Sequence, residues 1–444
     1  MGHRFVRFCH RYADHFRLKT RDVALQSKHY LQGLVQSPKK NMERMVEVVP
    51  NSDEQALQHF LSNSNWQERP VLDQVALEAD QLIGGAEDSA LLLDESGISK
   101  KGTRSVGVSR QWNGRLGKVD NCQVGVFAAL SRGSFATLID VRLYLPRKWT
   151  DNKARCDGAG IPIEAQRFKT KPELALEMIR HASALGVRYN WIGADGLYGN
   201  DPTFLRALDE QGEVFLIDVH KDQQIYLEDP EPRRVEAVQK RGRKSTRWQS
   251  ESTPIRVDQW LKQRPESAWK REVLRDGTKG TVTVEILHQR VWLWDGKEAK
   301  AHHWHLLVRR EIKSPNEIKY SLSNASEEVS SLKLAQMQGQ RYWVERSFQD
   351  GKSHAGLDHY QARGWKAWHH HMALVMMAML FMLEERVEQQ EDYPLLTCSD
   401  IETLLAHFLP RRDIDADEVI RQMELRHKKR QASIDSCFNK QQLE

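Results

Sequence analysis

The sequence has few cysteines and no pairing pattern among them. Five cysteines occur in 444 residues, and no two of them have the CxxC spacing. This excludes a disulfide-stapled scaffold and a cysteine zinc site, and it favours a reducing compartment. The longest apolar run, residues 372–383, has only twelve residues, well short of a bilayer span. The first residues also lack the apolar stretch of a secretory signal, so we expect a cytoplasmic protein with no membrane segment.

A large charge excess is absent as well. The chain has 66 Lys and Arg against 61 Asp and Glu, a net charge of +5. The total names no partner, but its distribution is uneven. Residues 1–40 carry nine basic and two acidic side chains, residues 41–80 carry two and eight, and residues 231–280 carry fourteen and seven. The two basic segments permit an anionic partner, and solvated loops are the alternative interpretation.

Hydrophobic periodicity predicts the fold class. Residues 1–86 have helical spacing, and from residue 89 the period changes to that of strands. The predicted order is strand, strand, strand, helix, strand, helix, strand, at residues 89–94, 122–130, 135–145, 171–185, 191–195, 201–211 and 213–219. This order indicates a mixed α/β sheet in which an antiparallel meander is followed by strands that return through helices.

The later part of the chain predicts further segments. Residues 221–303 lose the helical period, contain short strand-like runs at 281–287 and 291–294, and are rich in tryptophan. Another apolar run follows at 305–309, and strong helical patterns cover 330–349 and 364–390. We therefore divide the chain into an N-terminal helical domain (1–86), an α/β core (87–220 and 304–390), a β-rich insertion (221–303) and a helical, charged C-terminal tail (391–444).

Two acids follow apolar runs of the predicted sheet. Asp94 ends SALLLD and Asp195 ends WIGAD, and each precedes a glycine-containing turn. Acids at the carboxyl ends of neighbouring strands converge at one sheet edge, where ligands bind in open α/β folds. Two carboxylates held close together repel unless a cation lies between them, and Mg²⁺ or Mn²⁺ prefers such oxygen ligands. The alternative is that each acid only caps a turn.

A third acid lies in a later helical segment. Helical spacing places Arg341, Glu345, Phe348 and Lys352 on one face. Such a face would let Glu345 complete a metal site while the two cations neutralise phosphate oxygens. An ordinary ion pair on a solvated helix is the alternative.

Asp94, Asp195 and Glu345 together resemble the acid triad of the DDE transposases of bacterial insertion sequences. The similarity is greatest to the group around insertion sequences 4 and 701, whose signature is Y-x2-R-x3-E-x6-K. Arg341, Glu345 and Lys352 match it with the correct spacing, and Gln338 stands where the tyrosine is expected. The segments LLLDESGISKKG, ADGLYG and SFQDGKSHAGLDHYQARGWKAWHHHMAL resemble the 701 subgroup, and the resemblance spans about residues 88–383.

The resemblance implies an RNase H-like core, phosphodiester cleavage at transposon ends and transfer of the freed 3′-hydroxyl into target DNA. It implies two Mg²⁺ ions, with Mn²⁺ able to substitute, held by the three acids. It also implies double-stranded DNA partners, namely terminal inverted repeats and target, a homodimer on the DNA, and association with the bacterial nucleoid when bound. The basic N-terminal domain is the expected reader of the repeats.

Further DNA contacts are expected in the insertion. Trp292 or Trp294 would stack on a flipped base, although packing of a small β-domain is the alternative for both. The basic cluster at Lys240, Arg241, Arg243 and Lys244 would bind phosphates. The histidine groups 302–305 and 369–371 lack partner acids or cysteines at metal-binding spacing, so we expect no metal site there.

Two other functions remain open at this stage. A different metal nuclease on the same fold would show no inverted repeats around its gene. A catalytically dead, transposase-derived DNA-binding protein is the second alternative, and the presence of all three acids with the Arg/Lys pair argues against it.

Overall fold

A computed structural model describes residues 1–234, 248–277 and 280–441. The chain divides into two compact units. One unit comprises Arg69–Asp350 and Arg363–Trp365, and the other comprises Met1–Glu68, Gly351–Ala362 and Lys366–Glu444. Within the described residues, no helix is both long and apolar enough to cross a membrane.

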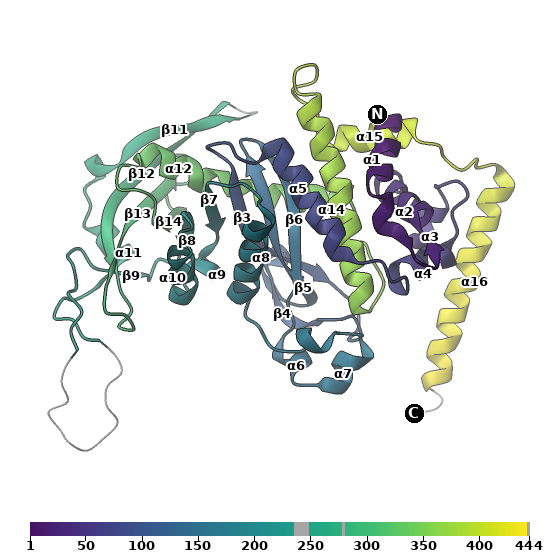
Figure 1. Ribbon diagram of the computed structural model, residues 1–444, viewed down its shortest axis with the longest axis horizontal. Helices are drawn as coiled ribbons and strands as arrows, with labels where there is room; N and C mark the ends of the chain where they lie inside the picture. Colours follow the sequence, from purple (N-terminus) through teal and green to yellow (C-terminus); the bar gives the residue numbers. More distant parts are fainter. Residues whose placement is uncertain (235–247, 278–279, 442–444) are drawn as a thin grey trace. The chain divides into compact units, whose positions relative to one another are not determined.

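The first of these units is built on one large mixed sheet (Figure 1). The sheet has ten strands in the order β11-β12-β13-β14-β8-β7-β3-β5-β4, with β6 also paired to β5. Its strands are β3 (Ala90–Ser99), β4 (Ser109–Asn113), β5 (Lys118–Arg132), β6 (Phe135–Leu143), β7 (Trp191–Ala194), β8 (Phe215–Val219), β11 (Lys270–Gly277), β12 (Gly280–Leu293), β13 (His302–Glu311) and β14 (Ile318–Ser323).

The predicted mixed α/β sheet is confirmed in its central part. β3 pairs antiparallel with β5, and β5 pairs antiparallel with β6, which gives the expected meander. β7 then pairs parallel with β3, and β8 pairs parallel with β7. The chain reaches these two strands through α8 (Lys171–Leu185) and α10 (Pro202–Glu210), as crossover connections between parallel strands require.

The tryptophan-rich segment contributes strands to the same sheet. β11 and β12 pair with each other, β12 pairs with β13, and β14 joins β13 to β8, all antiparallel. The two short runs expected at 281–287 and 291–294 fall in one continuous strand, β12, which ends at Leu293. The same segment contains β9 (Gln224–Ile225), β10 (Ile255–Arg256) and α11 (Val257–Lys262).

One sequence expectation about β3 is wrong. We expected the strand to end at Asp94 and the sequence D-E-S-G to form a turn, but β3 continues to Ser99 and stays paired with β5 up to Cys122. The long partner strand β5 supplies hydrogen-bonding groups for these extra residues. Gly97 is needed for packing, because a Cβ there would lie 2.7 Å from Oδ1 of Asn113.

Sequence-encoded caps fix the helices around the sheet. Thr170 and Glu173 form a capping box at the start of α8, and Gly186 ends that helix in a left-handed conformation. Asp201 caps α10, and Pro202 occupies its first turn. The remaining helices of this unit are α5 (Glu68–Ile83), α6 (Arg147–Thr150), α7 (Lys153–Gly158), α9 (Gly196–Gly199), α12 (Ser331–Gln340) and the first part of α13 (Tyr342–His354).

The second unit is helical apart from the two-residue strands β1 (Arg17–Leu18) and β2 (Arg21–Asp22). Its helices are α1 (Gly2–Arg11), α2 (Ala24–Gln36), α3 (Met42–Val46), α4 (Glu54–Ser62), α14 (Trp365–Glu388), α15 (Cys398–Phe408) and α16 (Ala416–Gln441). Most of α14 is buried, as expected for a helix that is apolar on all sides. Two of its histidines make packing contacts, since His370 stacks on Trp66 at 3.7 Å and His371 accepts or donates a hydrogen bond with Tyr30 at 2.9 Å.

Candidate active site

Three acids form a row across neighbouring strands of the central sheet. The last paired residues of β3 and β7 are Leu92 and Gly193, so the same register two residues further places Asp94 beside Asp195. The last pair of β7 and β8 is Ala194 and Ile217, so the next position places Asp195 beside Asp218. Because neighbouring strands lie about 4.8 Å apart and cross-strand neighbours share a face, Asp195 lies next to Asp94 on one side and next to Asp218 on the other.

Asp218 was not predicted from the sequence. It ends the apolar run FLID, the same pattern that singled out Asp94 and Asp195, so the signal was present. Its Oδ1 accepts a hydrogen bond of 2.5 Å from the Ser321 hydroxyl on β14. Gln338, at the position where the resembled signature has tyrosine, donates to the same hydroxyl at 2.5 Å.

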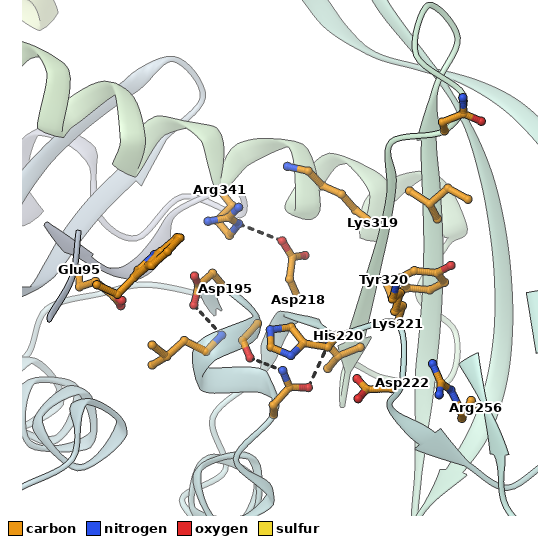
Figure 2. Close-up of a pocket in the computed structure, with 17 residues that line it drawn as sticks. Glu95, Asp195, Asp218, His220, Lys221, Asp222, Arg256, Lys319, Tyr320 and Arg341 are labelled. Atoms are coloured by element: carbon orange, nitrogen blue, oxygen red, sulfur yellow. Dashed lines mark hydrogen bonds and ion pairs between the residues drawn. The ribbon is translucent and has the colours of Figure 1, made fainter. Parts of the chain in front are cut away.

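Arg341 supplies the positive charge above this row. Its guanidinium lies 3.8 Å from a carboxylate oxygen of Asp94, 3.2 Å from Asp218 and 3.4 Å from Glu345. Figure 2 shows Arg341 above Asp195 and Asp218. Only 12% of the Arg341 side chain is exposed, and Asp218 together with the other acids raises its pKa even though burial opposes the charge. The cation is therefore held by carboxylates from β3, β8 and α13.

Glu345 shares Arg341 with the acid row but is much more open. Its side chain is 53% exposed, whereas that of Asp94 is 15% exposed. Helix α13 is fixed over the sheet by Phe348, whose ring packs edge-on against Phe127 at 5.2 Å, and Phe127 is the cross-strand neighbour of Asp94. The helix thus brings Glu345 to the same face as the row.

The electrostatics of the row favour a bound cation. Burial, followed by the nearby charge of Asp195, raises the pKa of Asp94 from its ordinary value of 3.8 to about 8. Burial, followed by the charge of Glu95, also raises the pKa of Asp195. Two carboxyl groups in this state resist joint ionisation unless a further positive charge reaches them.

The donor set suits a hard divalent ion, because it consists of carboxylate oxygens. In the part of the chain that the structure describes, however, no three His, Cys, Asp or Glu side chains converge closely enough to hold a metal ion. Glu345 is turned to Arg341 instead. The chemistry of the ligands therefore fits, and a complete ligand cage would require Glu345 to move towards Asp94 and Asp195.

Local backbone geometry fixes Asp195 in the middle of the acid row. It begins the short helix α9, and its Oδ1 accepts a hydrogen bond of 2.9 Å from the backbone N–H of Leu197. The capping role considered from the sequence is therefore present in addition to the location in the row. Gly199 lets α9 pack on β8, because a Cβ there would lie only 2.0 Å from the carbonyl oxygen of Asp218.

A cleft of about 1200 Å³ opens at this edge of the sheet. Asp195, Asp218 and Arg341 line it. Its wall also contains three further basic side chains, Lys221, Arg256 and Lys319, and two further acids, Glu95 and Asp222. Burial, followed by the charge of Arg341, lowers the pKa of Lys319. The cleft thus combines acids that attract metal with cations that attract phosphate.

Glu95, the residue after Asp94, is held by an ion pair and a hydrogen bond. Lys171 at the start of α8 forms an ion pair with it at 2.7 Å, and the Tyr198 hydroxyl donates to it at 3.3 Å. Burial and the charge of Glu95 raise the pKa of Tyr198 far above its usual range, so this hydroxyl stays protonated. Neither Glu95 nor Tyr198 was singled out from the sequence.

The other predicted DNA contacts are not among the residues that line the cleft, or they lie outside the described residues. Trp292 stacks on His303 at 4.5 Å, and the Trp294 indole donates to the carbonyl oxygen of Glu298 at 2.9 Å. Lys352 is half-buried on α13, seven residues after Glu345. The basic cluster of Lys240, Arg241, Arg243 and Lys244 lies outside the described residues, and its role stays a prediction.

Comparison with known proteins agrees with this chemistry. Residues 11–281 match the model of the family described as DDE superfamily endonuclease, a stretch that contains Asp94, Asp195 and Asp218. The chain is 25% identical over 333 residues to a protein of Microchaete diplosiphon named as the probable transposase for insertion sequence element IS701. That match covers 72% of this chain and 73% of the relative.

A solved structure also gives a weak match. The NurA nuclease from Sulfolobus solfataricus has 9% sequence identity and a TM-score of 0.24, over 63% of this chain and 85% of that one. A score this low supports no conclusion about the fold.

Proposed function

The chain belongs to the DDE superfamily of endonucleases, and from that premise we propose that it is the transposase of an insertion sequence. It binds the terminal inverted repeats of its element, cleaves DNA at the element's ends and joins the 3′ ends to target DNA. One observation carries the proposal. Asp94 and Asp195 are neighbours on parallel strands, and Arg341 forms ion pairs with both Asp94 and Glu345, so the three acids lie on the same face. Those are the three acids that the family resemblance assigns to catalysis.

Asp94, Asp195 and Glu345 would hold two Mg²⁺ ions, for which Mn²⁺ can substitute. When bound, such ions activate the attacking oxygen and stabilise the leaving oxygen of a phosphodiester. Arg341, which pairs with Asp94, Asp218 and Glu345, would be free to pair with the phosphate of the DNA when the acids serve as metal ligands. Lys319 and Lys221 hold neighbouring phosphates in the cleft through their charge. Lys352 is proposed as a further phosphate contact.

We further propose that the catalytic part is an RNase H-like core. Support comes from the antiparallel meander β3-β5-β6, from the parallel strands β7 and β8 reached through helices, and from the acid row across β3, β7 and β8. The division into a DNA-binding domain (1–86), a core (87–220 and 304–390), an insertion (221–303) and a tail (391–444) is part of this proposal. The basic charge of residues 1–40 supports repeat binding by the first of these.

A homodimer on the DNA is also proposed, because two element ends must be held together for coupled cutting and joining. A metal nuclease that cuts without joining is the second candidate, since the same acid row would serve either reaction. A catalytically dead derivative is the least supported alternative, because Asp94, Asp195 and Glu345 are all present on one face.

The test is a joining assay with the full chain. Labelled DNA that carries the element's own pre-cut ends is incubated with a supercoiled target plasmid and Mg²⁺. A transposase produces label covalently attached to the plasmid, and Glu345→Gln abolishes that product while DNA binding persists. A nuclease of the second class would cut an uncut end yet attach no label to the plasmid, and this result would overturn the proposal.

A further inference from the structure

Trp112 is an exposed tryptophan at the wall of the carboxylate cleft. Its side chain is 56% exposed, and it lines the cleft together with Asp195 and Arg341. An indole has a large apolar surface, and leaving it in water beside charged groups is unfavourable unless a partner covers it. Because Trp112 lies at the cleft that we assign to DNA, a DNA strand is the partner in position to cover it.

The backbone of β4 fixes the direction of this indole. Strand residues on either side of it are anchored to the sheet: Gln111 donates to the carbonyl oxygen of Cys122 at 2.8 Å, and Asn113 donates to the Ser99 hydroxyl at 3.2 Å. Asn113 is buried, and Gly97 leaves the space that it occupies. Because side chains alternate along a strand, these anchors direct Trp112 to the opposite face, away from the packed interior. The indole is therefore presented at a defined place.

The chain around Trp112 is strongly basic. Residues 100–120 contain six Lys or Arg and a single acid, Asp120. That acid is engaged, since it accepts a hydrogen bond of 2.8 Å from the Ser99 hydroxyl. Four of the basic side chains are exposed, namely Lys101, Arg104, Arg110 and Lys118. An aromatic ring flanked by cations is the combination that binds a nucleic-acid strand, with the ring under a base and the cations on its phosphates.

Resting on the proposed function, we infer that Trp112 is the stacking platform for an unpaired base of the DNA strand whose phosphodiester enters the cleft. Stacking on Trp112 holds that strand beside Asp94 and Asp195 after the base pairs at the end of the element have separated. The two tryptophans expected in this role are engaged elsewhere, Trp292 against His303 and Trp294 with Glu298. Neither of them lines the cleft.

The charge of the surroundings favours a nucleic-acid strand over a protein partner. The face of β4 that carries Trp112 also presents its cross-strand neighbour Val119, which is 50% exposed. A protein partner at this face would have to bury or pair the neighbouring cations, whereas phosphates pair with them directly. A protein contact is treated below as an outcome of the test.

The experiment measures DNA binding of the full chain in EDTA, where no cleavage occurs. Two DNAs are compared, one fully paired at the element's end and one with three unpaired nucleotides there. Four proteins are used: wild type, Trp112→Ala, Trp112→Phe and Val119→Ala. The phenylalanine variant keeps an aromatic face, and Val119→Ala removes an exposed apolar side chain from the same strand pair without removing a ring.

Trp112→Ala should bind the DNA with the unpaired end about 10-fold more weakly than wild type, within the range for one base on an aromatic ring. Trp112→Phe and Val119→Ala should stay close to wild type, and all four proteins should bind the paired DNA equally, which also shows that they are folded. Equal loss on both DNAs, or no loss on either, would overturn the inference and leave the proposed function standing. A changed oligomeric state with unchanged DNA affinity would assign the face to a protein contact. Failure of the wild type to bind either DNA would overturn the proposed function together with this inference.

Discussion

Replacing Asp94 by asparagine should stabilise the protein above neutral pH in the absence of metal. The reason is that Asp94 is held in a place that disfavours its charge: burial and the neighbouring Asp195 raise its pKa from 3.8 to about 8. In the unfolded chain the same carboxyl group ionises freely near its ordinary pKa. Folding therefore becomes less favourable as the pH rises from about 4 to about 8, and asparagine, which cannot ionise, escapes this loss.

The size of the effect follows from that interval. About four pH units at roughly 1.36 kcal/mol each give an upper figure of about 6 kcal/mol for the penalty at pH 8.5. Because 15% of the side chain is exposed, solvent screening reduces it, and we expect a gain of about 3 kcal/mol for Asp94→Asn. At pH 4 the Asp94 side chain of the folded wild type is mostly uncharged, like the asparagine of the variant. Wild type and Asp94→Asn should therefore differ much less in stability at pH 4.

Urea unfolding of both proteins in EDTA, at pH 4, 6 and 8.5, measures this difference. The pH 4 pair serves as the internal control, since it reports any effect of the substitution on packing alone. The expected result is an advantage of Asp94→Asn that grows from pH 4 to pH 8.5. An advantage that is absent at pH 8.5, or a variant that is less stable there than wild type, would refute the electrostatic account of the acid row.

Three further predictions concern the same site. Saturating Mg²⁺ or Mn²⁺ should raise the melting temperature of the wild type, with about 2.7 kcal/mol gained at 100 times the dissociation constant, and Asp195→Asn should lose most of that gain in the same thermal scan. Asp218→Asn should lower the cleavage rate constant about 10-fold and keep the metal-induced stabilisation, because Asp218 acts through Arg341; complete loss of both would instead make it a metal ligand. Phe348→Ala should cost about 3 kcal/mol in urea unfolding, since its ring is only 7% exposed and packs on Phe127, and an unchanged midpoint would contradict the proposed anchoring of α13.

Much of the central sheet was predictable because its strands contain apolar runs that can be recognised in the sequence. The run that ends at Asp195 is followed by the glycine-containing helix α9. The helix α8 begins with a capping box, Thr170 and Glu173, that can be recognised in the sequence. Periodicity alone was sufficient for these elements, because each is defined by residues close together in the chain.

Features that depend on a strand partner were not predictable. The end of β3 was placed at Asp94 because the apolar run stops there, yet the length of β5 extends the strand to Ser99. The runs of residues 281–294 could not be assigned to the main sheet, since a strand's pattern does not name its neighbour.

In the candidate site, too, residues marked by a local sequence pattern were predicted, and residues placed by strand pairing were not. Asp94 and Asp195 were found from pattern and resemblance, whereas Asp218 was missed although it ends a run of the same kind. Only the parallel register of β7 and β8 places it beside Asp195. Trp112 was equally invisible, because its exposure follows from the pairing of β4 with β5 and from the anchors on either side of it.

The most direct test of the central claim is the rate of Mg²⁺-dependent cleavage at the element's own DNA end, measured for wild type and Asp195→Asn in parallel. The account predicts that the wild type releases a 3′-hydroxyl at the end of the element, and that the variant binds the same DNA with equal affinity but does not cut it. Cleavage by the variant at the wild-type rate, or no cleavage of any element end by the wild type, would contradict a catalytic centre built on the acid row.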